Sequence, residues 1–154
     1  PSLMHRMNRM IKVIIFLTFV FAVLLLLMIG ITEQRLKVGK VCFKEHCFEV
    51  DIADAPWEQQ RGLMFKNHLE KDKGMLFVFE KEDVYPFWMK NTLIPLDIIW
   101  INQAKEVVFI KENALPCYQD DCPIIEAGQK AKYVLEVNGG VAQEISLAIG
   151  DKMY

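Results

Sequence analysis

The sequence predicts an α+β, β-rich fold: a small, partly closed barrel of mainly antiparallel strands with two short helices, preceded by one transmembrane helix. Three observations lead to this prediction. About eight short apolar segments alternate with turn residues. Two stretches carry helix start signals or an amphipathic pattern. Residues 13–31 contain no charged side chain, and the 154-residue chain has room for one ordinary domain after them.

The uncharged run at residues 13–31 accounts for much of the hydrophobic content of 53%. At about 1.5 Å per residue, a helix of this length spans roughly 30 Å, the thickness of a bilayer's hydrocarbon core. An uncleaved anchor is favoured over a cleaved signal peptide, because the run exceeds ~7–15 residues and no small-x-small site follows it. Arg6, Arg9 and Lys12 precede the run without any acidic residue. This pattern predicts a cytoplasmic N-terminus at residues 1–12.

A short tether is expected at residues 32–36, followed by a single extracytoplasmic domain at residues 37–154. Three of the 18 basic residues precede the span and all 20 acidic residues follow it, so the part after the span has a net charge of −5. This charge opposes nucleic-acid binding, which needs a basic face. We expect a monomeric domain, attached to the cell membrane through its N-terminal helix.

The elements of the domain follow from apolar patterning and turn signals. Strands are expected at residues 37–43, 48–53, 75–79, 85–90, 96–101, 106–112 and 132–137, with a last one starting at 150–151. A helix at 56–64 begins with an acidic cap, an early proline and an acidic first turn. A second short helix is amphipathic and covers 141–148. Between the strands, residues 113–129 form a long loop.

The four cysteines form two matching C-x4-C pairs, Cys42 with Cys47 and Cys117 with Cys122. The first pair would face each other across a hairpin and the second would close the long loop, so each can form a local disulfide. A zinc site with four thiolates is the alternative, although this spacing is not diagnostic of zinc. The even count, the pairwise spacing and an extracytoplasmic location favour two disulfides. No metal site and no cofactor are expected.

Several motifs occur in a recognisable order. They are WEQQRGLMF at 57–65, GMLFVF at 74–79, FWMKNTLIPLD at 87–97, NALPC at 113–117 with Cys122-Pro123, and YVLEVNGG at 133–140. Together they resemble the domain-of-unknown-function 192 family, small prokaryotic proteins that are often exported or membrane-anchored. The resemblance covers residues 37–152 and implies a compact β-rich domain. It implies no activity, and the first cysteine pair is not a hallmark of the family.

The central motif places polar side chains inside one of the most apolar stretches of the domain. Burying such groups without partners is costly, so the fold must pair them or use them. Lys90, Asn91 and Asp97 are therefore candidate ligand contacts. Arg61 is a cation suited to carboxylate or phosphate, and Trp88 offers an aromatic surface.

A structural role for these groups is the alternative, and we favour it for Asp97. Its carboxylate would then cap the turn at Asn91-Thr92 or pair with Arg61, since structural ion pairs also perturb pKa values. A glycosidase needs two well-placed carboxylates. Asp97 and Glu136 are available, but nothing in their spacing supports that pairing.

Two functions follow from these observations. The first is a ligand-binding or accessory module of the cell envelope, whose ligand is a small molecule or an envelope component. It is favoured because the sequence contains no Ser-His-Asp order, nucleotide-binding loop or HExxH helix. The alternative is a small envelope enzyme of the hydrolase type that uses Asp97 with Lys90 or Arg61.

Overall fold

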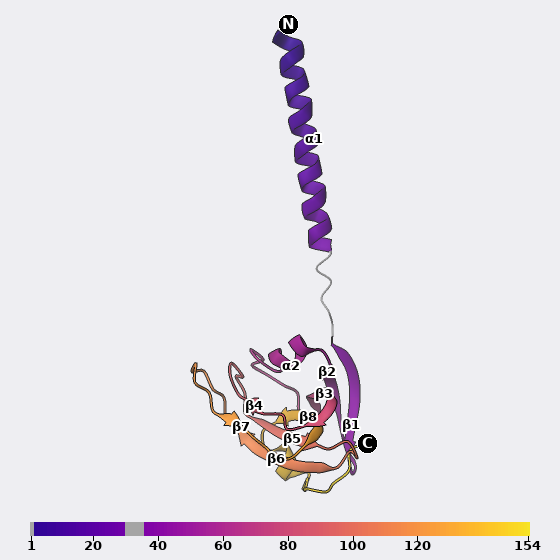
Figure 1. Ribbon diagram of the computed structural model, residues 1–154, viewed down its shortest axis with the longest axis vertical. Helices are drawn as coiled ribbons and strands as arrows, with labels where there is room; N and C mark the ends of the chain where they lie inside the picture. The colour runs from indigo at the N-terminus through magenta and orange to yellow at the C-terminus, as the bar shows by residue number, and fades with distance from the viewer. Residues whose placement is uncertain (1, 30–35) are drawn as a thin grey trace. The chain divides into compact units, whose positions relative to one another are not determined.

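The computed structural model describes residues 2–29 and 36–154, with side chains described for residues 9–25 and from residue 36 onward. By its internal contacts the chain divides into two units, Pro1–Arg35 and Leu36–Tyr154. The first unit contains the helix α1, Ser2–Ile29. The second unit contains all the strands and two short helices, α2 and α3 (Figure 1).

The helix α1 begins well before the uncharged run. Among the residues that the structure describes, no helix is both long and apolar enough to cross a membrane. Residues 30–31 of the predicted span, and 32–35 of the predicted tether, lie outside the described residues. The structure therefore does not bear out a transmembrane helix at 13–31.

The domain is built on a six-stranded mixed sheet. Its strands are β1 Lys37–Phe43, β2 His46–Ala53, β3 Lys73–Asp83, β5 Leu96–Ile101, β6 Val107–Ala114 and β8 Ala131–Asn138. They lie in the order β1-β2-β3-β8-β5-β6. Only β2 and β3 pair in parallel, and the helix α2, Pro56–Arg61, lies in the crossover that a parallel pair requires. The predicted β-rich α+β class is confirmed.

The sheet is open, so the prediction of a partly closed barrel is wrong. Strands β1 and β6 form its two edges. The C-terminal residues form isolated bridges beside both edges, Phe43 with Met153 and Glu106 with Lys152. The strand expected from 150–151 is reduced to these bridges. Closure would require long-range pairing between β1 and β6, which strand patterning cannot reveal.

The core has two parts, one on each face of the sheet. One part contains Ile99, Leu135 and Val137 and is covered by the helix α3, Val141–Glu144, and the C-terminal residues. The other contains Leu63, Phe77 and Trp100 and lies on the α2 side. Strand β5 is buried along its whole length because it contributes side chains to both parts. That explains why its sequence is apolar except for Asp97, and why its predicted bounds are confirmed.

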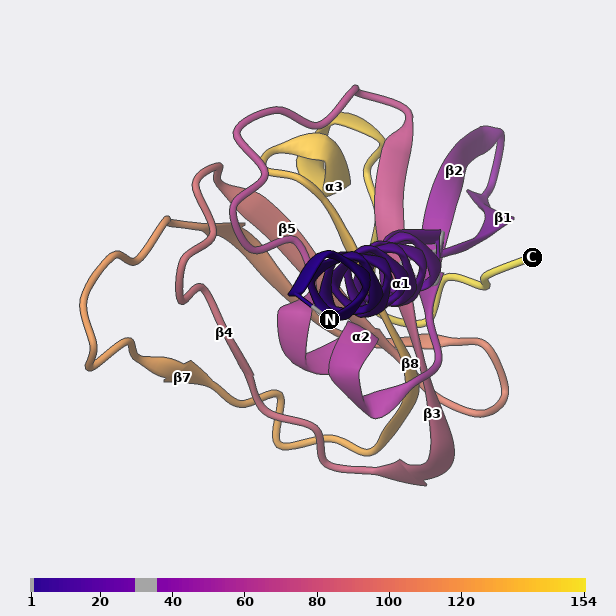
Figure 2. The ribbon, with the colours of Figure 1, turned by 90° about the horizontal axis from the view of Figure 1, so that it is seen from above.

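A second, two-stranded sheet lies outside the larger one (Figure 2). It pairs β4, Phe87–Trp88, with β7, Ile124–Ile125. The strand predicted at 85–90 is thus much shorter, since Pro86 precedes it and Asn91 has a left-handed backbone with φ of 56°. Conversely, the predicted loop 113–129 contains the short strand β7.

Both predicted disulfides are confirmed. Cys42 and Cys47 are directly opposed in the β1–β2 hairpin, with Cα atoms 4.0 Å apart. Cys117 and Cys122 close the loop between β6 and β7, with Cα atoms 5.9 Å apart. Because every cysteine sulfur is bonded to another, the alternative of a four-thiolate zinc site is excluded.

Candidate functional site

A cavity of about 120 Å³ lies on the α2 side of the six-stranded sheet. Its lining comes from α2 and the turn after it, from β3, from the segment around β4, and from the middle of β8. The lining residues are 59–64 and 85–88, together with Phe77, Phe79, Lys90, Thr92 and Glu136.

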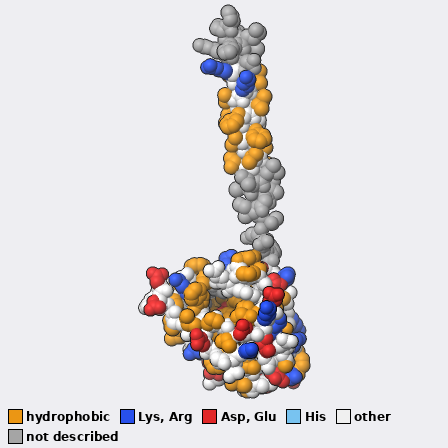
Figure 3. Space-filling view, in the orientation of Figure 1, with side chains coloured by type: hydrophobic (Ala, Val, Ile, Leu, Met, Phe, Trp, Pro, Cys, Tyr) orange, Lys and Arg blue, Asp and Glu red, His pale blue; other side chains and the backbone are white. Residues whose placement is uncertain are grey.

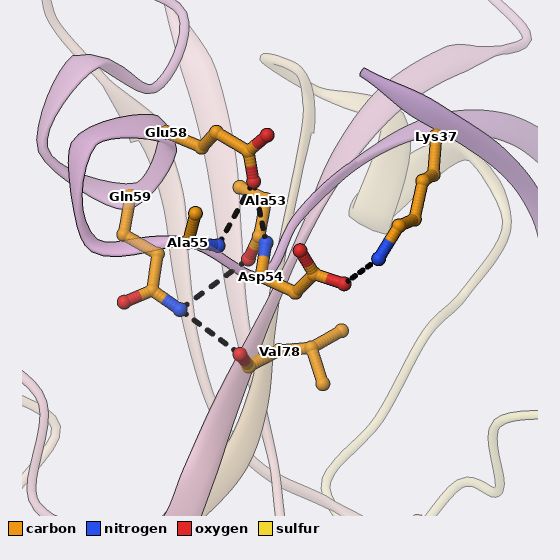
Figure 4. Close-up of polar contacts among 7 residues, drawn as sticks. All are labelled: Lys37, Ala53, Asp54, Ala55, Glu58, Gln59 and Val78. Carbon is orange, nitrogen blue, oxygen red and sulfur yellow. Dashed lines mark hydrogen bonds and ion pairs between the residues drawn. The ribbon is translucent and has the colours of Figure 1, made fainter.

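Helix α2 is fixed over the sheet by hydrogen bonds from its own side chains. The carboxylate of Glu58 accepts hydrogen bonds from the backbone N–H groups of Asp54 and Ala55, both at 2.9 Å (Figure 4). The side-chain amide of Gln59 donates to the carbonyl oxygen of Val78 on β3 at 2.9 Å. These bonds satisfy backbone groups at the helix start and tie the helix to the strand. The wall that α2 contributes to the cavity is therefore held in place.

Gly62 ends this helix and brings it close to the sheet. Its φ of 48° lies in the left-handed region that favours glycine. A Cβ at this position would lie 3.2 Å from Phe77 Cζ and 3.9 Å from Glu136 Oε2. The absence of a side chain here keeps the space in front of Glu136 open.

Glu136 is the most unusual polar group of the domain. It lies in the centre of β8, directly opposite Met75 on one side and Ile98 on the other. The residue is only 5% exposed, and its Oε2 atom has no hydrogen-bond partner among the described residues. Burial raises the pKa of Glu136 to about 8, because the low-polarity surroundings disfavour the charged carboxylate. At pH 7 the side chain is mainly a neutral carboxylic acid that can donate a hydrogen bond.

Aromatic side chains form the apolar wall of the cavity. Phe87 packs edge-to-face against Phe77, with ring centroids 4.9 Å apart, and against Phe79 at 6.5 Å. Phe79 also stacks on Tyr85 at 3.6 Å. Trp88, which is 44% exposed, completes the wall towards solvent. Mutual packing of this kind holds the rings in fixed orientations, which favours flat ligands.

Two cations belong to the outer lining of the cavity. Arg61 is exposed, and its guanidinium forms no ion pair or hydrogen bond within the part of the chain that the structure describes. Lys90 Nζ lies 3.7 Å from a carboxylate oxygen of Asp120. Asp120 belongs to the loop between β6 and β7, which projects at the left of Figure 1, where acidic side chains are visible in the space-filling view (Figure 3).

The disulfide-closed loop also fixes the backbone beside Lys90. The N–H of Asn91 donates to the carbonyl oxygen of Cys117 at 2.9 Å, and the N–H of Cys117 donates to that of Met89 at 3.2 Å. The cation at position 90 is therefore positioned by a loop that a covalent bond constrains. Within the described ranges, no group of three or more His, Cys, Asp or Glu side chains could hold a metal ion.

Residues 39–154 match the sequence profile of the family DUF192, described as "Uncharacterized ACR, COG1430". The chain belongs to the DUF192 family. The resemblance predicted from the motifs is thereby confirmed, over nearly the whole domain.

Two solved structures are similar to this DUF192 chain. A protein of unknown function from Novosphingobium aromaticivorans DSM 12444 is 36% identical, with a TM-score of 0.72 and coverage of 77% of this chain and 86% of its own. A protein from Sinorhizobium meliloti 1021, described as a "putative transcription regulator", is 30% identical, with a TM-score of 0.75 and coverage of 80% and 97%. No curated protein matches the chain.

The DUF192 domain brings three of the five candidate ligand contacts together. Arg61, Trp88 and Lys90 all line the cavity. Asn91 is adjacent but not part of the lining; its left-handed backbone turns the chain, and its carbonyl oxygen accepts a hydrogen bond from the N–H of Phe65 at 2.8 Å.

Asp97, the fifth candidate, lies on the opposite face of the sheet. Its fully buried carboxylate accepts hydrogen bonds from three backbone N–H groups: Asn113 at 2.7 Å, Gly140 at 3.0 Å and Ala142 at 2.7 Å. It therefore joins the end of β6 to the start of α3. These contacts include neither the expected pairing with Arg61 nor the expected cap at Asn91-Thr92. They do agree with the structural role that we favour for Asp97.

Glu136 was considered in the sequence only as a partner for Asp97, and its own importance was missed. The available signal was one glutamate between Leu135 and Val137 in an otherwise apolar strand of the DUF192 motif. Sequence alone does not distinguish it from Asp97, since both are single acids in buried strands.

Proposed function

We propose that the DUF192 domain of this chain is a binding module for a small molecule, and that the ligand occupies the Glu136 cavity. The observation that carries the proposal is Glu136, which lines the cavity and whose buried Oε2 atom has no hydrogen-bond partner among the described residues. An unsatisfied buried polar atom costs about 1–3 kcal/mol. A ligand that supplies the missing partner would recover part of that cost.

The remaining lining supports this proposal. Ligand sites are concave and mostly apolar, with a few polar groups that orient the ligand, and the aromatic wall with Glu136, Thr92 and Arg61 has this composition. A cavity of about 150 Å³ holds one benzene molecule. At about 120 Å³, this cavity suits one small ring or a comparable end group.

The proposal is tested by screening the full chain against a small-molecule library by thermal shift. Ligands of the cavity raise the melting temperature of the wild-type chain and lose that effect in Glu136→Leu, which offers no hydrogen-bonding atom. Glu112→Leu, an exposed change on β6, serves as the matched control and retains the effect. If every ligand found stabilises Glu136→Leu as much as wild type, the cavity is not the site.

A second candidate is an enzyme in which Glu136 acts as a general acid or base. It is favoured by a pKa of about 8, because proton transfer is most efficient when the pKa lies near the working pH. Here Glu136 replaces Asp97, whose carboxylate oxygens are occupied by backbone N–H groups. A Glu136→Gln protein that binds its ligand but no longer converts it would favour the enzyme; loss of binding itself favours the module.

We further propose that the domain works in an oxidising compartment outside the cytoplasm, because two disulfides persist poorly in a reducing one. Attachment to the cell membrane, with the N-terminus in the cytoplasm and the domain outside, stays a prediction from the sequence of residues 1–31, as does the monomeric state. Cell fractionation combined with thiol labelling tests both location and disulfide state.

The S. meliloti protein is described as a "putative transcription regulator". We do not propose that function for this chain, because the net negative charge of the domain opposes binding to DNA.

A further inference from the structure

The lining of the Glu136 cavity differs between its buried end and its outer end, and this difference narrows the ligand class. We propose that the ligand is a small ring-shaped monocarboxylate with a hydroxyl group on the far side of the ring from its carboxylate. This inference rests on the proposed function, because it describes the occupant of the same cavity.

The buried end selects a neutral hydrogen-bonding group. Glu136 lines the cavity, its Oε2 atom is buried and has no partner in the described structure, and Gly62 places no side chain against it. A hydroxyl group can accept a hydrogen bond from a carboxylic acid and donate one to a carboxylate, so it satisfies either form of Glu136. A charged group at this depth would lose its hydration without an opposite charge beside it, which is far more costly.

The middle of the cavity selects a ring. Phe77, Phe79 and Phe87 form an edge-to-face cluster, and an inserted ring meets their faces and edges in the geometry that aromatic pairs prefer. The volume of about 120 Å³ matches one ring.

The outer end selects an anion. Arg61 and Lys90 approach the cavity from different elements, α2 and the segment after β4. Arg61 has no partner in the described part of the chain, and its guanidinium can bind a carboxylate through two parallel hydrogen bonds. Lys90 Nζ donates a hydrogen bond of 3.5 Å to the carbonyl oxygen of Asp120 and lies 3.7 Å from its carboxylate. Because Asp120 is fully exposed, these contacts are weak, and a ligand carboxylate can compete for Lys90. A neutral ligand such as a sugar could accept hydrogen bonds from these cations but would gain no charge pairing.

The experiment is calorimetric titration of the full chain with three matched probes. The first, 4-hydroxybenzoate, carries both groups; benzoate lacks the hydroxyl, and 4-hydroxybenzyl alcohol lacks the carboxylate. We expect 4-hydroxybenzoate to bind about tenfold more tightly than either of the others. Benzoate lacks the hydrogen bond to Glu136, and the alcohol lacks the two parallel charge-assisted hydrogen bonds to Arg61.

Two variants assign each end of the probe. Arg61→Gln is expected to weaken 4-hydroxybenzoate about tenfold and leave the alcohol unchanged. Glu136→Leu is expected to reduce 4-hydroxybenzoate to the affinity of benzoate, with Glu136→Gln as a second variant of conserved volume. Lys130→Gln, an exposed change away from the cavity lining, is the control and alters nothing.

The outcomes separate this inference from the function beneath it. The inference is wrong if none of the probes binds. It is also wrong if both variants bind the probes with the same affinities as the wild-type chain. If a neutral compound from the library then binds and loses its affinity when Glu136 is replaced, the proposed binding function is supported and only the proposed ligand class is wrong. If no compound at all depends on Glu136, both are overturned.

Discussion

Replacing Glu136 with glutamine should change how the stability of the domain depends on pH. In the unfolded chain this glutamate ionises near its ordinary pKa of 4.5, whereas burial raises its pKa to about 8 in the folded domain. The folded state therefore holds a proton that the unfolded state has released between these two values. Because the folded pKa is the higher one, the contribution of Glu136 to stability is fully present below pH 4.5. It is lost as the pH rises to about 8.

The size of the effect follows from the two pKa values. Each tenfold difference in proton affinity corresponds to about 1.4 kcal/mol, so the interval from 4.5 to about 8 amounts to about 5 kcal/mol in full. Between about pH 5.5 and pH 8, where the protein is convenient to handle, about 3 kcal/mol of this should be lost. Glutamine cannot ionise, so Glu136→Gln does not lose this contribution.

The assay is urea denaturation of both proteins at several pH values with the disulfides intact. The measured quantity is the difference in unfolding free energy between Glu136→Gln and wild type, which should rise by about 3 kcal/mol in favour of the variant. Other shifted groups are present in both proteins and cancel. One example is Asp151, whose pKa is lowered chiefly by a hydrogen bond from Lys44.

A difference that stays constant within about 0.5 kcal/mol over this range would refute the reasoning. It would mean that Glu136 ionises near its ordinary pKa, and hence that water or a partner reaches Oε2. Glu112→Gln, the exposed control, should show such a constant difference.

Three further predictions concern the elements around the site. Asp97→Asn should cost about 2–4 kcal/mol in urea denaturation, because an amide NH₂ would face one of three backbone N–H donors; an unchanged midpoint would show that these bonds are not formed. Gly62→Ala should lose about 1–2 kcal/mol by strain at φ 48° and crowding of Phe77, and a gain in melting temperature would contradict this. Changing Cys117 and Cys122 to serine should lower the free energy of unfolding by about 2 kcal/mol, through loss of loop-closure entropy. It should also weaken anion binding at the cavity. If the variant and the wild-type chain have equal stability and affinity, the loop does not position Lys90.

Strand positions and covalent pairing were accessible from the sequence because local signals determine them. Apart from Asp97, the run of β5 from Leu96 to Ile101 is apolar because both faces of that strand are buried, and its bounds could be read directly. The cysteines are five residues apart in each pair, so chain geometry alone brings their sulfurs together. The family membership follows from the same local motifs.

The closure of the sheet was not accessible in this way. Whether β1 meets β6 depends on how far the sheet has turned after six strands and on where the C-terminal residues settle. Those are long-range relations that no single segment encodes. The position of the cavity is similar, since it forms where α2, β3, β8 and the segment around β4 converge.

The sequence by itself determined that two acids, Asp97 and Glu136, stand in buried strands of a disulfide-bonded β-rich domain. Only the tertiary structure decided which of them is satisfied. Asp97 faces the side of the sheet where the turn after β8 presents backbone N–H groups, so it holds the fold. Glu136 faces the other side, where Gly62 leaves open space and no donor. The physical reason is that a hydrogen-bond partner from a distant segment is a property of three-dimensional packing, and this packing makes Glu136 the centre of the candidate site.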